Sequence, residues 1–169
     1  MRKANDYYPT PQSFVDALIH NLQWHYTDEE HYWEPCSGDG RIVKALKKSG
    51  RNNVIGTDIQ NGEEQDFFKY KTALAPNIIT NPPFKVIRPF IDHAFEIGVW
   101  RMILFCNERL FACKKGYNQF KHHRPSRFIN LTWREDYLGK GGSPDRSIAI
   151  AIWDCPHSYR TLYEVWNND

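Results

Sequence analysis

Residues 31–40, His31-Tyr32-Trp33-Glu34-Pro35-Cys36-Ser37-Gly38-Asp39-Gly40, indicate the fold class, because a short aromatic strand runs directly into a loop with two glycines. Glycines after a strand let the backbone approach a ligand closely and turn into a helix. Apolar residues at helical spacing follow in 42–46, and Gly50 can end that helix. A strand, a glycine loop and a helix in this order predict an α/β domain with a mostly parallel sheet.

The remaining sequence alternates strands and helices in the same way. Its 169 residues correspond to one domain, 1–169. Further helices are expected from Thr10-Pro11, with Thr10 as N-cap, and from Pro89. A short glycine-rich linker separates the last two expected strands, so these should be antiparallel neighbours. The further strands expected from the sequence are 53–59, 77–80, 101–107, 127–133 and 147–153.

The composition limits the functional classes. A formal net charge of +2 does not by itself indicate a nucleic-acid partner, whereas an aromatic share of 15% suits a core and also a surface that stacks on bases. The four cysteines contain no Cys-x-x-Cys pair, and no metal site is expected. The N-terminus lacks a secretory signal and no stretch is long enough to span a bilayer. We therefore expect a cytoplasmic protein without a membrane partner.

The glycine loop differs from the dinucleotide-binding fingerprint. No third glycine follows it, which argues against a nicotinamide oxidoreductase, and acidic residues flank it. Such residues would repel a pyrophosphate but suit S-adenosylmethionine, which carries a sulfonium and an ammonium group. Asp58 can accept hydrogen bonds from both ribose hydroxyls, while Asp66 and the ring of Phe67 can contact adenine. Taken singly, these features also fit an ordinary turn and a solvated acidic surface.

The most specific feature is residues 78–84, Ile78-Ile79-Thr80-Asn81-Pro82-Pro83-Phe84, an apolar strand that ends in a rigid polar turn. An exocyclic aromatic amine is a poor nucleophile because its lone pair is delocalised into the ring. The Asn81 side-chain oxygen and the Pro82 carbonyl can hold that lone pair towards a methyl group by accepting the amine hydrogens. Phe84 supplies a stacking face for an extruded base.

These motifs resemble those of the S-adenosylmethionine-dependent N6-adenine DNA methyltransferases, in particular the small phage and bacterial type. The family signature is Asn/Asp/Ser-Pro-Pro-Tyr/Phe/Trp, which residues 81–84 match. Residues 34–40 match its Glu-Pro-x-x-Gly-x-Gly loop, and residues 8–11 match its Tyr-x-Thr-Pro segment. The closing stretch, 139–154, resembles the final hairpin of the small enzymes. The resemblance covers nearly the whole chain.

The resemblance implies a Rossmann-like α/β domain with a mostly parallel seven-stranded sheet, an antiparallel final hairpin and helices on both faces. It implies S-adenosylmethionine as cofactor and DNA as substrate. The larger DNA enzymes of this family carry an extra target-recognition domain, and no separate domain of that kind is expected here. The catalytic residues implied are Asn81, Pro82, Pro83 and Phe84. The cofactor-binding residues implied are Tyr8, Thr10, Pro11, Glu34, Pro35, Cys36, Gly38, Gly40, Asp58, Ile59, Asp66, Phe67 and Asn81.

A basic segment, 114–127, follows the expected strand 101–107, on the edge where ligands bind in open α/β sheets. It contains no acidic residue, and its aromatic residues interleave with cations as a nucleic-acid surface requires. A solvated loop is the alternative. The expected nucleic-acid-binding residues are Lys114, Lys115, Lys121, Arg124 and Arg127. Adenine in RNA, a protein glutamine amide and a non-catalytic binding module remain alternatives to a DNA enzyme.

Overall fold

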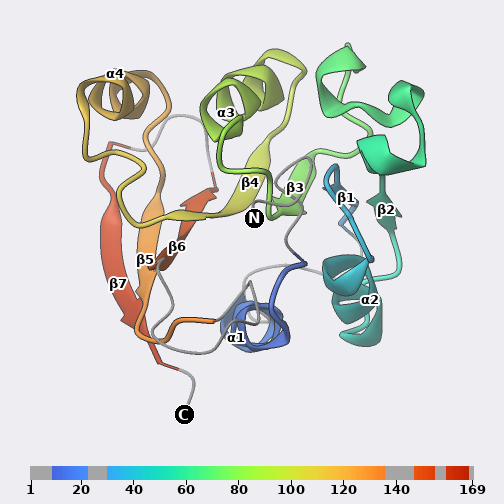
Figure 1. Cartoon of the computed structure of the whole chain (residues 1–169), viewed down its shortest axis with the longest axis horizontal. Helices are drawn as coiled ribbons and strands as arrows, with labels where there is room; N and C mark the ends of the chain where they lie inside the picture. Colours follow the sequence, from blue (N-terminus) through green and yellow to red (C-terminus); the bar gives the residue numbers. More distant parts are fainter. Residues whose placement is uncertain (1–8, 23–29, 136–146, 155–158, 168–169) are drawn as a thin grey trace, which may run out of the picture.

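The computed structural model describes residues 9–22, 30–135, 147–154 and 159–167. They form a seven-stranded sheet in the order β2-β1-β3-β4-β6-β5-β7, with helices on both faces (Figure 1). The strands are β1 (Tyr32–Glu34), β2 (Val54–Gly56), β3 (Asn77–Thr80), β4 (Arg101–Asn107), β5 (Arg127–Leu131), β6 (Ile148–Trp153) and β7 (Leu162–Trp166). The helices are α1 (Gln12–Leu22), α2 (Arg41–Lys48), α3 (Ile87–Glu96) and α4 (Lys114–His122).

One half of the sheet is parallel, as the sequence predicts. β1 pairs in parallel with both β2 and β3, and β3 pairs in parallel with β4. The connections from β1 to β2 and from β3 to β4 each cross one face of the sheet, by way of α2 and α3. The carboxyl ends of these strands therefore lie at one edge, and the loops that follow them are neighbours in space.

The other half contains the predicted antiparallel hairpin. β6 lies between β4 and β5 and is antiparallel to both. The hairpin does not end the chain, because β7 follows and pairs in parallel with β5 at the edge of the sheet. The strand pattern alone does not predict β7, since Leu162, Tyr163 and Val165 remain exposed and only Trp166 of its large side chains is buried.

Two hydrophobic cores lie on opposite faces of the sheet. Neighbouring strand residues point to opposite faces, so Tyr32 contributes to one core and Trp33 to the other. The first core lies under α1 and α2 and includes Phe14. The second lies under α3 and includes Phe90. The two cores hold the sheet from both sides, which fixes the edge where the candidate site lies.

Two helix starts differ from the prediction. The first hydrogen bonds of α1 go to the Pro11 carbonyl, from Phe14 N at 3.2 Å and Val15 N at 3.3 Å, so Pro11 rather than Thr10 takes the capping position. α3 begins at Ile87, before the expected start at Pro89. Pro89 still lies in the first turn, where its missing N–H costs no intrahelical hydrogen bond.

α4 occupies part of the segment that the sequence marks only as basic. Its buried residues are Gly116 and Gln119, so it has no apolar stripe for a helical pattern to detect. A Cβ on Gly116 would lie 2.4 Å from the Leu110 carbonyl oxygen, which shows how closely α4 packs on the preceding loop. Gln119 Nε2 donates to the Arg88 carbonyl at 2.8 Å and to Asp92 Oδ1 at 3.0 Å. Polar contacts thus dock α4 on α3.

Candidate functional site

The three predicted motifs lie at the carboxyl edge of the parallel strands. β1 leads into the glycine loop, β2 leads to Asp58, and β3 leads to Asn81. β1 is hydrogen-bonded to both other strands, with Tyr32 opposite Val54 and Asn77. The structure therefore brings together side chains that the sequence places far apart.

Asp58 fastens the glycine loop to the end of β2. Its Oδ2 accepts from the Gly38 N–H at 2.8 Å, and its Oδ1 accepts from Gln60 N at 2.9 Å. Gly38 has φ 50° and Gly40 has φ 76°, in the left-handed region that favours glycine. Asp58 is only 6% exposed, so it is not the solvated surface aspartate of the alternative interpretation. A carboxylate oxygen has two lone pairs, so both oxygens keep capacity to accept from a ligand.

Glu34 lies beneath the glycine loop. Its side chain is 2% exposed, and its Oε2 accepts from Val43 N in α2 at 3.2 Å. Burial raises the pKa of this carboxyl well above its usual range, and the nearby carboxylates of Asp39 and Asp58 add to that effect. Burial likewise raises the pKa of the Cys36 thiol, with a smaller contribution from Asp58. Glu34 thus supports the loop from below, and a cationic ligand would favour its ionised form.

Replacing Glu34 with glutamine should reduce the pH dependence of stability. The unfolded-state pKa is about 4.3 and the folded-state pKa is higher, so the folded state holds more protons between them. The stabilisation is complete below the unfolded-state pKa and is lost as pH rises through the folded-state pKa. Glu34→Gln keeps an acceptor for Val43 N and cannot ionise. Urea unfolding across this pH range should show a smaller decline for the variant, and parallel profiles would contradict the assignment.

Thr10 links the start of α2, directly after the glycine loop, to Asn81. Its carbonyl accepts from Arg41 Nη1, at the start of α2, at 3.1 Å. Its hydroxyl oxygen accepts from Asn81 Nδ2 at 3.2 Å. Thr10 is 8% exposed, so these hydrogen bonds are shielded from solvent. The segment before α1 thus orients the Asn81 side chain, a role that the N-cap interpretation of Thr10 did not foresee.

Asn81 presents an acceptor that no group in the described structure satisfies. Its amide nitrogen is taken by Thr10, while its Oδ1 is buried and has no hydrogen-bond partner. An unsatisfied buried carbonyl costs about 1–3 kcal/mol, and such groups in native proteins call for an explanation. A ligand donor at this position would satisfy the oxygen. The next turn is closed by Val86 N, which donates to the Pro83 carbonyl at 3.0 Å.

Of the predicted adenine-binding pair, Asp66 is half-buried and Phe67 belongs to the second core. Asp66 Oδ1 accepts from Phe68 N at 3.1 Å. The Phe67 ring is 4% exposed and stacks on Phe90 with ring centroids 4.0 Å apart. The ring is therefore part of the second core, and its proposed contact with the cofactor adenine stays a prediction. Ile59, directly after Asp58, is 52% exposed and provides an apolar surface on that side of the site.

Comparison with known proteins identifies the fold. No protein-family model matches the chain, and no curated protein sequence matches it. A methyltransferase subunit of a type I restriction-modification system from Streptococcus thermophilus is similar in structure, with a TM-score of 0.67 and 11% identity over 94% of this chain. The chain has a methyltransferase fold. It spans 47% of the Streptococcus protein, about half its length.

Two further methyltransferase structures match over more of their own length. A suggested RNA methyltransferase from Pyrococcus horikoshii has a TM-score of 0.62 and 20% identity, covering 87% of this chain and 85% of that protein. An RNA methyltransferase from Salinibacter ruber, solved in complex with S-adenosyl-L-homocysteine, has a TM-score of 0.54 and 16% identity, covering 90% of this chain and 96% of that protein. The methyltransferase fold thus occurs here with little sequence identity.

The expected nucleic-acid-binding residues have three different environments in the structure. Lys114, Lys115 and Lys121 are exposed on α4, where Lys121 Nζ lies 5.7 Å from the centroid of the Tyr117 ring. Arg127 lies on β5 and makes hydrogen bonds of 2.6 and 2.8 Å to both carboxylate oxygens of Glu164 on β7. Arg127 therefore joins two strands through this ion pair, and its contact with phosphate stays a prediction.

Arg124 has a mixed environment. Its Nη1 donates to the Tyr159 carbonyl at 2.8 Å, and its guanidinium lies 5.1 Å from the centroid of the Phe120 ring. It is half-buried and supports the turn into β5. Tyr8, the remaining predicted site residue, lies outside the described residues, as does the glycine-rich linker 138–143.

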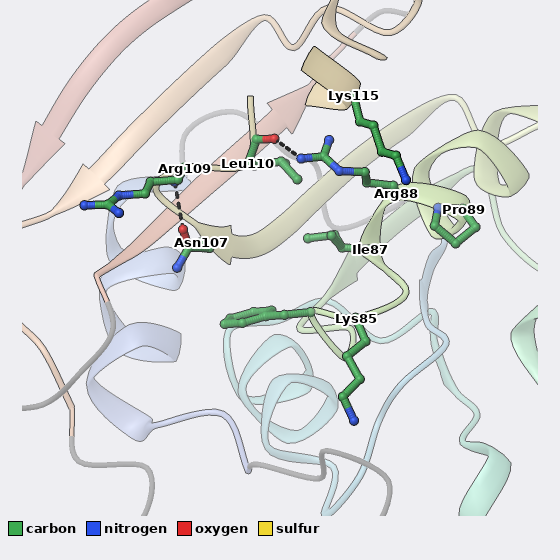
Figure 2. Close-up of a pocket in the computed structure, with 9 residues that line it drawn as sticks. Lys85, Ile87, Arg88, Pro89, Asn107, Arg109, Leu110 and Lys115 are labelled. Atoms are coloured by element: carbon green, nitrogen blue, oxygen red, sulfur yellow. Dashed lines mark hydrogen bonds between the residues drawn. The ribbon is translucent and has the colours of Figure 1, made fainter. Parts of the chain in front are cut away.

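A basic pocket lies beside the Asn-Pro-Pro-Phe turn and was not predicted. Its volume is about 500 Å³, and it lies between the turn after β3, the start of α3 and the loop between β4 and α4 (Figure 2). Its lining residues include Phe84, Lys85, Arg88, Asn107, Arg109 and Lys115. Of these, only Lys115 belongs to the predicted basic segment, because the other cations come from separate stretches of sequence.

The described residues hold neither a metal-binding cluster nor a membrane-spanning helix. Among residues 9–22, 30–135, 147–154 and 159–167, no three His, Cys, Asp or Glu side chains gather as a metal site would require. Within the same ranges, no helix has the length and apolar character needed to cross a membrane.

Proposed function

We propose that this protein transfers a methyl group from S-adenosylmethionine to the exocyclic N6 amino group of adenine in nucleic acid, with DNA as the favoured acceptor. The observation that carries the proposal is the Asn81 amide, fixed by Thr10 through its nitrogen and left with a buried, unsatisfied oxygen. Asn81 directly follows β3, which pairs with β1, so its oxygen lies at the carboxyl edge of the sheet near the loop that follows β1.

The Asn81 oxygen suits an amino group that must become more nucleophilic. Accepting a hydrogen bond from the adenine amine directs the nitrogen lone pair out of the ring plane, towards the methyl carbon. The nitrogen–carbon bond would form as the methyl–sulfonium bond breaks, leaving S-adenosyl-L-homocysteine, and the amine would lose one proton to solvent. Because the amide is already oriented by Thr10, little reorganisation is needed when the nitrogen becomes tetrahedral. The Pro82 carbonyl is the second proposed acceptor, and the proline at 83 restricts its direction. Phe84 is proposed to stack on the base.

The carboxylates of Glu34, Asp58 and Asp66 suit a positively charged cofactor. S-adenosylmethionine supplies the methyl group on a positively charged sulfonium. Asp58, with lone pairs remaining on both oxygens, would hold the ribose hydroxyls, and exposed Ile59 would pack on the adenine ring. Asp66 would accept from the cofactor's adenine amino group. Glu34 and the glycine loop would lie near the methionine portion, where the cationic groups favour nearby carboxylates.

Asp58→Ala should weaken cofactor binding by about 1–3 kcal/mol, the cost of losing hydrogen bonds to a charged acceptor. Calorimetric titration with S-adenosylmethionine measures this directly. Asp39→Ala is the matched control, because Asp39 is a partly exposed carboxylate in the same loop and pairs with Arg41 at 2.8 Å. Equal affinity in the wild type and Asp58→Ala would show that the ribose contact is assigned to the wrong residue.

RNA is the second candidate acceptor, favoured by the similarity to the Salinibacter RNA methyltransferase. A glutamine amide presents the same chemistry to Asn81, but four cations beside Phe84 favour a phosphate-bearing acceptor. Incubation with labelled S-adenosylmethionine and unmethylated DNA, RNA or a glutamine-containing peptide distinguishes them. We expect label in DNA. Label only in RNA or in the peptide would overturn the choice of acceptor, and label in none would overturn the proposed activity.

A further inference from the structure

The basic pocket is strongly one-sided in charge. Four of its lining residues are cations, Lys85, Arg88, Arg109 and Lys115, and none of its lining residues is acidic. The Glu108 carboxylate lies 3.9 Å from Arg109 Nε, and Arg109 is itself 83% exposed. An exposed pair at that distance contributes little. Arg88, Arg109 and Lys115 therefore give the pocket a positive potential, and no acidic residue lines it.

The charged side chains of the pocket carry only hydrogen-bond donors. Arg88 donates to the Leu110 carbonyl, to Cys113 Sγ at 3.3 Å and to Gln119 Oε1 at 3.4 Å, so its role is to fix a positive charge at the pocket wall. Asn107 Oδ1 accepts from Arg109 N at 2.9 Å, so its amide nitrogen points away from that bond (Figure 2). Lysine and arginine only donate. A ligand that only accepts, such as a phosphate group, matches this set of donors.

Phe84 lines the same pocket, which links it to the proposed base site. We propose that the basic pocket binds a phosphodiester group adjoining the nucleotide whose base stacks on Phe84. The proposal rests on the proposed function for the identity of that base. A volume of about 500 Å³ lies within the usual range for small-molecule sites of about 300–1,000 Å³, so a sugar-phosphate unit can enter.

The role of such a contact is positioning. Phosphate contacts fix the register of a protein on a nucleic acid without reading its sequence. Holding the backbone beside Phe84 would bring the extruded base towards Asn81, and this alignment lowers the entropic cost of reaction. Without the phosphate contact, the expected kinetic effect is therefore a higher KM for nucleic acid, with a smaller change in kcat.

The double variant Lys115→Gln, Arg109→Gln tests the proposal. Both side chains are exposed, so the fold should persist, whereas Arg88 is left in place because it joins α3 to the loop before α4. Lys47→Gln, Lys48→Gln is the matched control. It also removes two exposed cations, at the end of α2, which runs away from the site edge. Binding of a fluorescent adenine-containing DNA duplex is measured over a salt series without cofactor.

The slope of log K against log salt should become shallower by about 0.9 for each phosphate of a duplex that the variant no longer neutralises, or by about 0.7 on a single strand. The control should keep the wild-type slope. An unchanged slope in the pocket variant, or an equal change in the control, would overturn the pocket assignment even if DNA is methylated. A different result would separate the two proposals. If the slope changes only in the pocket variant but the wild type transfers no methyl group, the proposed function is overturned and the phosphate site is supported.

Discussion

Asn81→Ala should lower methyl transfer by about 100-fold or more while S-adenosylmethionine affinity stays close to that of the wild type. Removing a preorganised donor or acceptor at a reacting centre costs this much because it acts mainly in the transition state. The Asn81 oxygen is buried and unsatisfied, so among the described contacts the alanine variant loses only the hydrogen bond from Asn81 Nδ2 to the Thr10 hydroxyl. The loss should therefore appear in kcat, with the fold and cofactor site preserved.

Thr10 provides the control for that interpretation. Thr10→Val removes the hydroxyl that accepts from Asn81 Nδ2, whereas Thr10→Ser keeps it. If orientation of the amide matters, the valine variant should lose turnover and the serine variant should retain most of it. Equal turnover in both would mean that the Thr10 hydroxyl does not position Asn81. An Asn81→Ala enzyme with near wild-type turnover would contradict the proposed mechanism itself.

Phe67→Ala should lower the free energy of unfolding by about 3–5 kcal/mol, as expected for truncation of a large buried aromatic side chain. Its ring is enclosed by Phe90 at a centroid distance of 4.0 Å, by His93 at 5.1 Å and by Trp33 at 5.4 Å. The alanine variant would leave a cavity between η4 (Phe67–Lys69) and α3. Denaturant titration measures the change in stability.

Phe68 is the matched comparison, because it is the next residue and is 37% exposed. Phe68→Ala should cost much less stability than Phe67→Ala. Phe67→Leu should recover most of the stability and leave cofactor affinity unchanged. Phe67 variants that are as stable as the wild type but bind S-adenosylmethionine weakly would instead show that the Phe67 ring contacts the cofactor.

The parallel half of the fold and the arrangement of the motifs were predictable because their signals are local. Glycines at 38 and 40 mark the loop after β1, and both have positive φ in the structure. Gly50, with φ 98°, ends α2 as expected, through Gly50 N to the Lys47 carbonyl at 3.1 Å. Parallel pairing then brings the ends of β1, β2 and β3 to one edge. Each step follows from short stretches of sequence.

The features that were missed depend on partners far away in the sequence. α4 packs through Gly116 and Gln119, so it lacks the apolar period that marks a helix. Arg127 is neutralised by Glu164, a residue on a strand that the pattern did not predict. Phe67 and Phe68 are identical neighbours, and only the tertiary structure decides which one is buried. The basic pocket likewise combines cations from separate segments.

The most direct test of the central claim is nucleoside analysis of DNA after incubation with the protein and labelled S-adenosylmethionine. The DNA is digested, and the position of the label on the base is determined by chromatography and mass spectrometry. The proposed function predicts label in N6-methyladenine with the wild type and about 100-fold less with Asn81→Ala. Label on a ring nitrogen, on cytosine or equally in both proteins would contradict the assignment of Asn81 as the acceptor for the adenine amino group.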